Sequence, residues 1–425
     1  MKLKKINLVA ADMGYGHQRA AYPLLGLSAG EIISINDYKG ITDWEKEYWV
    51  KSLRSYEKIS RLKKVPVIGA LVFAIMDAFQ KIQPAYPHRD LSEPTTQQKY
   101  FYKVVRKGLG RELIESLNPS GLPFVTTFFV AAYIAEYHDY KGDIYCIICD
   151  TDASRAWAPL EPKVSRVKFL LPSEKVRERF LMYGVKPENI IISGFPLPKE
   201  NIGADRQILV NDIASRVRVL DQGGLYQDRY RSLLEAITPG FSRKHDFPLT
   251  ITYAVGGAGA QKEIGVTIMN RLAQEIRADK MDLNLVAGNR PEVRDYFLAE
   301  MKKAGFKEGR GVSIIYDEDK IAYFRKFNEC LHDTDILWTK PSELSFYCAL
   351  GLPIIISSPV GSQEDFNRDW LLSIGAGVDS LDPEYVNEWL PDMLDSGRLA
   401  RAAMDGFLNA EQMGAYNIEK IIDGK

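Results

Sequence analysis

Cysteine is scarce in this sequence and shows no pairing pattern. The 425 residues include four cysteines, Cys146, Cys149, Cys330 and Cys348. Disulfide-stapled domains carry cysteines far more densely, so a disulfide framework is excluded. Cys146 and Cys149 form a C-x-x-C inside an apolar run, where no second pair or nearby histidine completes a zinc site. We therefore expect both in a buried strand and predict no metal site.

Excess charge and long hydrophobic runs are also lacking. Lysine and arginine total 55 against 56 for aspartate and glutamate, and no basic stripe is interleaved with aromatic residues, so nucleic acid is not an expected partner. The longest apolar run, residues 65–79, is interrupted by Pro66 and Asp77 and is shorter than the ~20 residues of a membrane-spanning helix. The first residues lead into a strand-like stretch instead of a signal peptide, which predicts a cytoplasmic protein.

Residues 51–79 have two interpretations. Positions 51–64 are rich in lysine and arginine, with Glu57 as their only acidic residue, and they precede the apolar run. The segment can be a solvated helix followed by a core helix, since buried helices have the same pattern. A basic helix leading into an apolar one can also dock on the anionic inner face of a membrane. The second interpretation predicts a peripheral membrane contact through 51–79.

An alternation of strand and helix patterns runs through both halves of the chain. Short apolar runs bounded by turn residues predict strands at 5–11, 31–35, 123–127, 144–149, 168–171 and 190–193, and again at 249–255, 283–287, 312–316, 335–338 and 354–357. With helices between them, these strands predict mostly parallel, doubly wound sheets. Breaker residues concentrate at 194–203, so we place a linker at about 195–205.

Glycine-rich turns follow the first strand of each half. Gly14, Gly16 and His17 lie where the strand at 5–11 gives way to a helix, so their backbone faces the sheet edge where α/β proteins bind ligands. A histidine there suits a proton acceptor at neutral pH, although most loop histidines are merely solvated. Gly256, Gly257 and Gly259 form a loop whose amides could cradle a phosphate, or a tight turn that needs small residues. No Gly-Lys-Ser/Thr follows, which excludes a P-loop ATPase.

Two further clusters carry polar residues at strand ends. Asp150, Thr151 and Asp152 follow the strand at 144–149, and a D-x-D at such a place is how metal-dependent GT-A glycosyltransferases hold a donor diphosphate. The block 339–367 predicts a loop, a helix, a buried strand opened by Gly-Leu-Pro, and a polar loop. Its geometry is that of a ligand site at the edge of a parallel sheet.

The order and spacing of these motifs resemble GT-B glycosyltransferases. The branch concerned holds monogalactosyldiacylglycerol synthase, the processive diacylglycerol glucosyltransferases and the peptidoglycan GlcNAc transferase. The resemblance covers about residues 6–380 and implies two Rossmann-like doubly wound domains that face a central cleft. It places the acceptor-side domain at 1–195, the nucleotide-sugar domain at 206–398, and a helix that returns to the first domain at 399–425.

The resemblance also implies roles for individual residues. His17 would lie beside the acceptor hydroxyl, and the acceptor side would include Gly14, Gly16, Asp152, Arg155 and Trp157. This match competes with the GT-A interpretation of the D-x-D, and Arg155 stands about where the branch often has histidine. Donor-binding residues would be Gly256, Gly257, Gly259, Asn289, Lys340, Ser342, Glu343, Gln363, Glu364 and Asn367.

The first part of block 339–367 departs from the family pattern. The branch has two glycines where this chain has Ser342 and Glu343, and a ribose-binding glutamate where it has Phe346. Glu343 lies one helical turn before Phe346, so it could bind the ribose or simply complement the helix dipole.

By resemblance, the expected reaction moves a sugar from a nucleotide diphosphate donor, a UDP-sugar, to an acceptor hydroxyl with inversion, without a metal or another cofactor. The acceptor would be a lipid such as a diacylglycerol, and a soluble small molecule remains an alternative. Two further alternatives are a GT-B-fold UDP-GlcNAc 2-epimerase and a degenerate nucleotide-sugar-binding protein. Phe346 in the place of the ribose glutamate supports the last of these.

Overall fold

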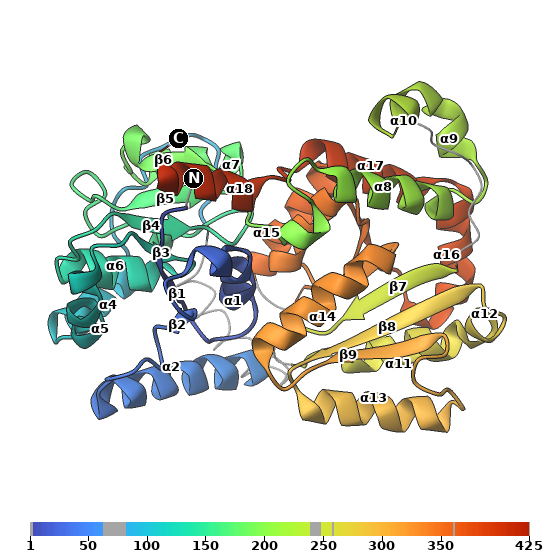
Figure 1. Cartoon of the computed structure of the whole chain (residues 1–425), viewed down its shortest axis with the longest axis horizontal. Helices are drawn as coiled ribbons and strands as arrows, with labels where there is room; N and C mark the ends of the chain where they lie inside the picture. The colour runs from blue at the N-terminus through green and yellow to red at the C-terminus, as the bar shows by residue number, and fades with distance from the viewer. Residues whose placement is uncertain (1–2, 63–81, 239–247, 257–258, 360–361, 425) are drawn as a thin grey trace. The chain divides into compact units, whose positions relative to one another are not determined.

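The computed structural model describes residues 3–62, 82–238, 248–256, 259–359 and 362–424. The chain divides into two compact units. One unit comprises Met1–Pro196, Gly361–Phe366 and Met413–Lys425, and the other comprises Leu197–Val360 and Asn367–Gln412. Each has its own parallel sheet with helices on both faces (Figure 1). The two doubly wound α/β domains expected from the sequence are thereby confirmed.

The first unit contains a six-stranded sheet in the order β2-β1-β3-β4-β5-β6, with every described pairing parallel. Its strands are β1 (Asn7–Ala10), β2 (Ile33–Ser34), β3 (Phe124–Thr126), β4 (Ile144–Ile147), β5 (Lys168–Leu171) and β6 (Ile190–Ile192). Its α-helices are α1 (Gly16–Ala21), α2 (Asp43–Leu62), α4 (Thr96–Arg106), α5 (Arg111–Leu117), α6 (Phe129–Tyr137), α7 (Glu174–Met182) and α18 (Gly414–Asp423). Short 3-10 helices are η1 (Tyr22–Leu27), η2 (Asn118–Ser120), η3 (Arg155–Trp157) and η4 (Pro187–Asn189).

Both faces of the first sheet are buried, as the continuous apolar strands predicted. Successive residues of a strand point to opposite faces, so Val9 belongs to one hydrophobic cluster while Leu8 and Ala10 belong to another. Each fully buried Val or Leu side chain contributes about 1.5–3 kcal/mol to folding. The second cluster includes Ile418 and Ile422 of α18, which Figure 1 shows in red among the elements of this unit.

The second unit has a six-stranded parallel sheet in the order β12-β11-β10-β7-β8-β9. Its strands are β7 (Leu249–Ala254), β8 (Met281–Gly288), β9 (Val312–Tyr316), β10 (Ile336–Thr339), β11 (Ile354–Ile356) and β12 (Gly377–Asp379). Its α-helices are α8 (Gln207–Leu220), α9 (Leu225–Arg229), α10 (Arg231–Ile237), α11 (Lys262–Arg271), α12 (Ala273–Arg277), α13 (Pro291–Lys303), α14 (Lys320–Asp333), α16 (Val386–Asp395) and α17 (Arg398–Asn409). Short 3-10 helices are η5 (Lys199–Asn201), η6 (Glu343–Leu350) and η7 (Pro383–Tyr385), and α8 lies beside α17 (Figure 1).

The helix α15 (Ser362–Ser373) corrects one expectation from the sequence. The polar stretch around Gln363 and Glu364 was expected to be a loop, but it forms the first turn of this helix. Glu364 and Asp365 in that turn complement the positive end of the helix dipole, so a polar sequence here favours a helix start. The first turn of α15 groups with the first unit and the remainder with the second.

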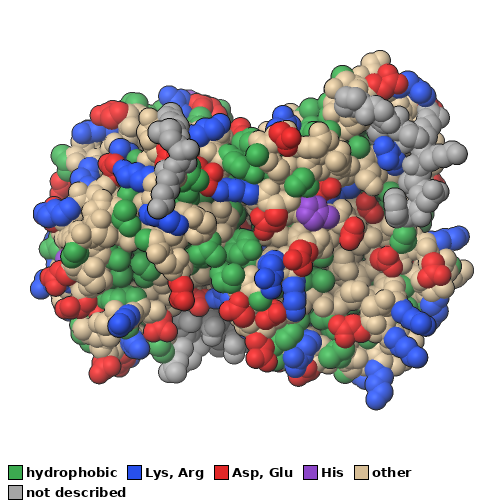
Figure 2. All heavy atoms as spheres, in the orientation of Figure 1, with side chains coloured by type: hydrophobic (Ala, Val, Ile, Leu, Met, Phe, Trp, Pro, Cys, Tyr) green, Lys and Arg blue, Asp and Glu red, His purple; other side chains and the backbone are tan. Residues whose placement is uncertain are grey.

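Surface charge follows the near-neutral composition. On the face shown in Figure 2, acidic and basic side chains are interspersed over each unit. Across the described residues, no helix is both long and apolar enough to cross a membrane. Most of the proposed contact segment 51–79 lies outside the described residues, because the structure describes only its first part, at the end of α2.

Candidate functional site

His17 lies at the point where the first sheet reverses its strand order. The chain leaves β1 for β2 on one side and later returns to β3 on the other side, and ligands of open α/β sheets bind outside the carboxyl ends of the strands at such a point. His17 follows β1, and Thr127 follows β3. Nδ1 of His17 lies 2.7 Å from the carbonyl oxygen of Thr127, and the Thr127 hydroxyl donates to the His17 carbonyl at 2.8 Å.

The Thr127 carbonyl fixes the tautomer of His17. A carbonyl oxygen only accepts hydrogen bonds, so Nδ1 carries the proton that it donates. In the neutral ring, the lone pair is therefore on Nε2, the atom that a general base uses. The imidazole is half-buried, with its ring centroid 4.9 Å from that of Phe128 and 6.2 Å from that of Trp157.

Gly14 and Gly16 shape the turn that delivers His17. Gly14 has φ +114°, a conformation that L side chains rarely adopt, and Gly16 is the first residue of α1. Trp157 is buried and lies at the end of η3, with its ring 4.8 Å from that of Phe129. The structure thus brings together four residues selected from the sequence, Gly14, Gly16, His17 and Trp157. Thr127 and Phe128, which the sequence analysis did not select, also contact His17.

Asp152 is held by a partner that the sequence did not suggest. Arg179 of α7 donates from Nε to Oδ1 and from Nη2 to Oδ2, both at 2.9 Å. Both side chains are buried, with 1% and 3% of their surfaces exposed. Burial by itself lowers the pKa of Arg179, but the hydrogen bond and negative charge of Asp152 raise it above its usual value. A carboxylate whose two oxygens accept from a guanidinium is poorly placed to bind a cation, which weighs against the metal-binding D-x-D interpretation.

Arg155 bonds to backbone carbonyls. Its Nε and Nη2 donate to the Ser92 carbonyl at 3.1 and 2.7 Å, and its Nη1 donates to the Ala158 carbonyl at 2.9 Å. Burial lowers the pKa of this guanidinium. Arg179 makes a similar bond to the carbonyl of Gln83 at 2.7 Å. Together the two arginines fasten the loop 83–92 to the segment that carries Asp152 and Trp157.

Lys340 and Gly256 lie at the corresponding point of the second sheet. The chain runs from β7 through β8 to β9 on one side and returns to β10 on the other, so the order reverses between β7 and β10. Gly256 follows β7, and Lys340 follows β10. A Cβ at Gly256 would lie 2.5 Å from Cε of Lys340, so a larger residue here would displace the lysine side chain from its present position.

Arg290 lies near the other end of the same glycine turn. The amide of Gly259 donates to the Gly256 carbonyl at 2.7 Å, and a Cβ at Gly259 would lie 3.7 Å from Cδ of Arg290. Arg290 precedes α13 and directly follows Asn289, which is half-buried at the end of β8. The predicted donor residue Gly257 lies outside the described residues.

The donor residues after Lys340 have mixed surroundings. Ser342 precedes η6, where the expected α-helix is instead a 3-10 helix, and Glu343 is its first residue. Phe346 is buried with its ring 5.2 Å from that of Trp370, so it is part of the apolar core. Asn367 is also buried and donates to the Pro341 carbonyl at 3.4 Å. Gln363 and Glu364 are half-buried in the first turn of α15.

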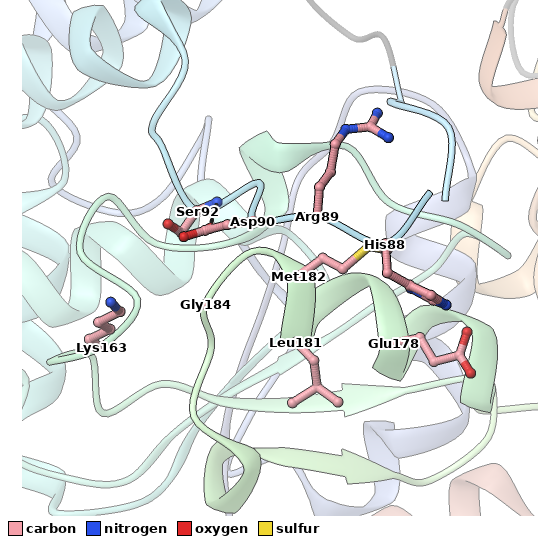
Figure 3. A pocket seen from close by; sticks show the side chains of 9 residues that line it. All are labelled: His88, Arg89, Asp90, Ser92, Lys163, Glu178, Leu181, Met182 and Gly184. Carbon is pink, nitrogen blue, oxygen red and sulfur yellow. Dashed lines mark hydrogen bonds between the residues drawn. The ribbon is translucent and has the colours of Figure 1, made fainter. Parts of the chain in front are cut away.

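A pocket of about 600 Å³ lies beside α7 of the first unit (Figure 3). His88, Arg89 and Lys163 line it together with Asp90 and Glu178, so its charges nearly cancel. Asp90 accepts from the Ser92 amide at 2.8 Å, a bond that, with one from the Ser92 side chain, lowers the pKa of its carboxyl. This pocket contains none of the residues selected from the sequence.

Comparison with known proteins bears on the fold. No family model and no curated protein matches the sequence. Among solved structures, MurG from Acinetobacter baumannii has a TM-score of 0.51 at 12% identity, covering 99% of this chain and 100% of that chain. The chain has the GT-B fold. UDP-GlcNAc 2-epimerase from Neisseria meningitidis bound to UDP-GlcNAc has a TM-score of 0.48 at 11% identity, covering 99% and 100% of the two chains. WaaG, a glycosyltransferase involved in lipopolysaccharide biosynthesis, has 0.40 at 13% identity, covering 98% and 100%.

The expected GT-B class is therefore confirmed for the fold, whereas the particular lipid-glycosyltransferase branch stays a prediction. Three residues of this GT-B chain went unnoticed in the sequence: Thr127, Arg179 and Arg290. Thr127 is the last residue of a predicted strand and Arg290 follows the turn after another one, which is the signal that could have selected them. Arg179 is an ordinary helix residue in the sequence, and only the folded chain pairs it with Asp152.

Proposed function

We propose that this GT-B protein transfers a sugar from a nucleotide diphosphate donor, a UDP-sugar, to an acceptor hydroxyl. One arrangement carries the proposal, and it occurs in both units. At the strand-order reversal of each sheet, a side chain suited to one half of the reaction lies against a residue that follows the neighbouring strand. In the first unit this is His17 on Thr127, and in the second it is Lys340 on Gly256.

The second unit would hold the donor. Gly256 and Gly259 have no side chains that would keep a diphosphate from the backbone, and Lys340 and Arg290 beside these two glycines would supply positive charge. In the reaction, the bond between the anomeric carbon and the phosphate oxygen breaks, and the nucleoside diphosphate leaves with the electron pair. The two cations would stabilise that leaving charge, which supports a metal-independent reaction.

The first unit would hold the acceptor hydroxyl. The acceptor oxygen forms the new bond to the anomeric carbon, and its proton passes to Nε2 of His17. Thr127 accepts from Nδ1 and so keeps the ring in the tautomer that can take this proton. Direct attack by one oxygen inverts the anomeric configuration. The proton-accepting role of His17 would contribute roughly 10²–10⁴-fold to the rate.

A lipid is the acceptor that we propose, as the sequence motifs suggested. The described part of α2 exposes Trp44 and Val50, each with more than 40% of its surface accessible, and a membrane contact would cover this apolar surface.

A second candidate is a nucleotide-sugar-binding protein that does not catalyse transfer. It is favoured by Phe346, which packs against Trp370 where the resembling family has a ribose-binding glutamate. In that case the second unit would still bind a nucleotide diphosphate through the glycine turn. His17 would then have no catalytic consequence.

Two measurements on the full chain test the proposal. Thermal unfolding is first recorded with UDP, GDP and TDP and their sugars, because a ligand of the folded state raises the melting temperature. A donor that raises it is then supplied with diacylglycerol vesicles or soluble alcohols, in the presence and absence of EDTA, and nucleoside diphosphate release is measured. NMR of the product reports the anomeric configuration.

The expected result is stabilisation by a UDP-sugar, EDTA-insensitive release of UDP that depends on the acceptor, and an inverted product. Donor binding without acceptor-dependent release would favour the binding protein. Conversion of UDP-GlcNAc without any acceptor would indicate an epimerase. Failure of every nucleotide to raise the melting temperature would refute the proposal.

A further inference from the structure

A small apolar pocket lies between α4 and α6 of the first unit. It has a volume of about 90 Å³ and is lined by Phe101, Tyr102, Phe129, Val130, Tyr133 and Ala156, with glutamines at its edge. The two tyrosine hydroxyls bond to the backbone: that of Tyr133 donates to the Ala156 carbonyl and that of Tyr102 accepts from the Leu160 amide, both at 3.3 Å. The pocket therefore presents mainly carbon surface to an occupant.

Aromatic rings connect this pocket to His17. Phe129 lines the pocket, and its ring centroid lies 4.8 Å from that of Trp157 and 5.2 Å from that of Phe128. Both of those rings contact the imidazole of His17, at 6.2 and 4.9 Å. Phe128 and Phe129 are only half-buried, so part of this aromatic surface is accessible. The pocket and the imidazole thus share one continuous aromatic wall.

We infer that this pocket binds an apolar group of the acceptor while the reacting hydroxyl lies at His17. The inference rests on the proposed function and names the acceptor class, an amphiphilic alcohol. Its hydroxyl would lie at His17, and its hydrocarbon or aromatic end would reach the pocket past the rings of Phe128 or Trp157 and of Phe129. An engineered cavity of about 150 Å³ holds benzene, so this smaller one accommodates roughly three or four carbons. Sugars and glycerol lack the group that would occupy it.

The polar residues at the pocket support an apolar occupant. Gln98 is buried, and its side-chain amide donates to the Ala158 carbonyl at 2.7 Å. The side chains of Tyr102, Tyr133 and Gln98 are therefore turned toward the backbone. A polar ligand group placed among the rings would lose its bonds to water without gaining equivalent ones, which disfavours it strongly.

Ala156→Leu tests the inference by filling the pocket. Ala156 is half-buried at the pocket wall, and leucine adds three carbons, close to the expected occupancy. Ala322→Leu is the matched control, because Ala322 is a half-buried alanine of α14 in the second unit. Val130→Ala is a second variant, which enlarges the pocket. Thermal unfolding with and without UDP confirms that each variant folds and binds the donor.

The assay measures UDP release against a series of 1-O-alkylglycerols with chains of two to ten carbons, and against diacylglycerol in phosphatidylcholine vesicles. We expect the KM of wild type to fall about fourfold per methylene until the pocket is filled, then to level off. Ala156→Leu should abolish this fall, raising KM for the longer chains roughly 50-fold. Val130→Ala should move the plateau to longer chains, and Ala322→Leu should behave as wild type. Release with soluble alkylglycerols alone identifies a free alcohol as the acceptor, and release only with vesicles identifies a membrane lipid.

Direct binding of the alkylglycerols, followed by tryptophan fluorescence, separates the two hypotheses. If the wild-type affinity rises with chain length, if this rise disappears in Ala156→Leu, and if no acceptor is glycosylated, the pocket is upheld and the proposed function is refuted. Transfer with a KM independent of chain length would uphold the function and overturn the pocket. An Ala156→Leu protein that folds and keeps the wild-type chain-length series would overturn it as well.

Discussion

The buried pair Asp152 and Arg179 permits a quantitative prediction. The perturbation is Asp152→Asn, which preserves the shape of the side chain and removes its charge. Arg179 then keeps its positive charge in a place where only 3% of its side chain is exposed, without the carboxylate that accepts two of its hydrogen bonds at 2.9 Å. The new amide group also brings a donor against the guanidinium, which has only donors.

The expected cost is about 3–5 kcal/mol of unfolding free energy. Breaking a buried pair by removing one partner typically costs this much, because an uncompensated charge stays buried. An exposed ion pair contributes only about 0–1 kcal/mol, since solvent screens it. For a unit of roughly 200 residues, 1 kcal/mol moves the melting temperature by about 2–4 °C, so Asp152→Asn should lower it by roughly 10 °C.

Urea and thermal unfolding monitored by circular dichroism provide the assay. Glu174→Gln is the matched control, because Glu174 forms an exposed pair with Arg177 on the same helix and should cost less than about 1 kcal/mol. The double variant Asp152→Leu with Arg179→Met replaces the pair by apolar side chains and should recover most of the lost stability. If Asp152→Asn lowers the unfolding free energy no more than the control does, the buried ion pair does not stabilise the protein as argued. The same holds if the losses of unfolding free energy in the single variants Asp152→Leu and Arg179→Met simply add up in the double variant.

Four further predictions concern the remaining parts of the molecule. His17→Ala should reduce acceptor-dependent UDP release at least 100-fold while donor binding is unchanged, with His88→Ala as a control; equal loss of donor binding would indicate a structural role instead. Gly256→Ala places a Cβ 2.5 Å from Cε of Lys340, a flexible side chain that can move, so UDP binding should weaken about tenfold while the melting temperature changes by less than about 2 °C. Arg290→Gln should weaken the binding of UDP more than that of uridine, and Arg294→Gln in the first turn of α13 is the control. Equal weakening of UDP and uridine binding would contradict a phosphate contact. Burial raises the pKa of Asp335 to about 7 against the opposing effects of the Thr250 amide and Arg216, so the folded state holds this proton more tightly than the unfolded state. The unfolding free energy of the wild type should therefore fall by up to about 4 kcal/mol as the pH rises from about 4 to 7. Asp335→Asn should flatten that pH dependence.

Much of the fold could be predicted from local patterns. The apolar runs of the sequence correspond to strands β1 to β11, because a run of four to eight buried residues between turn signals favours a strand wherever it lies in the chain. The strand β12 was missed, since Gly377–Asp379 contains one buried apolar residue and pairs only with β11. The start of α15 was missed because its acidic residues are equally typical of a loop and of a helix N-terminus.

The candidate site could be predicted only in part. Turn motifs such as Gly14 to His17 are visible in the sequence because glycine permits backbone conformations that other residues avoid. The partners of Asp152 and Phe346 are not visible, because each contact is made with a residue from a different element, and the bond from Arg155 to the distant Ser92 carbonyl is not visible either. Phe346 in particular looks like a substituted ligand residue in the sequence, and the structure shows it packed on Trp370.

The sequence by itself determined that this protein has two series of alternating strands and helices, each opened by a strand and a glycine turn, because periodicity and turn chemistry are local properties. Only the tertiary structure decided what those turns lie against. His17 and Thr127 are 110 residues apart in the chain, and the order of strands β1 and β3 brings them within hydrogen-bonding distance. That bond selects the imidazole tautomer, and strand order likewise brings Lys340 onto Gly256. Contacts of this kind depend on which strands become neighbours. The burial of both faces of each sheet decides that order, and no single stretch of the sequence contains it.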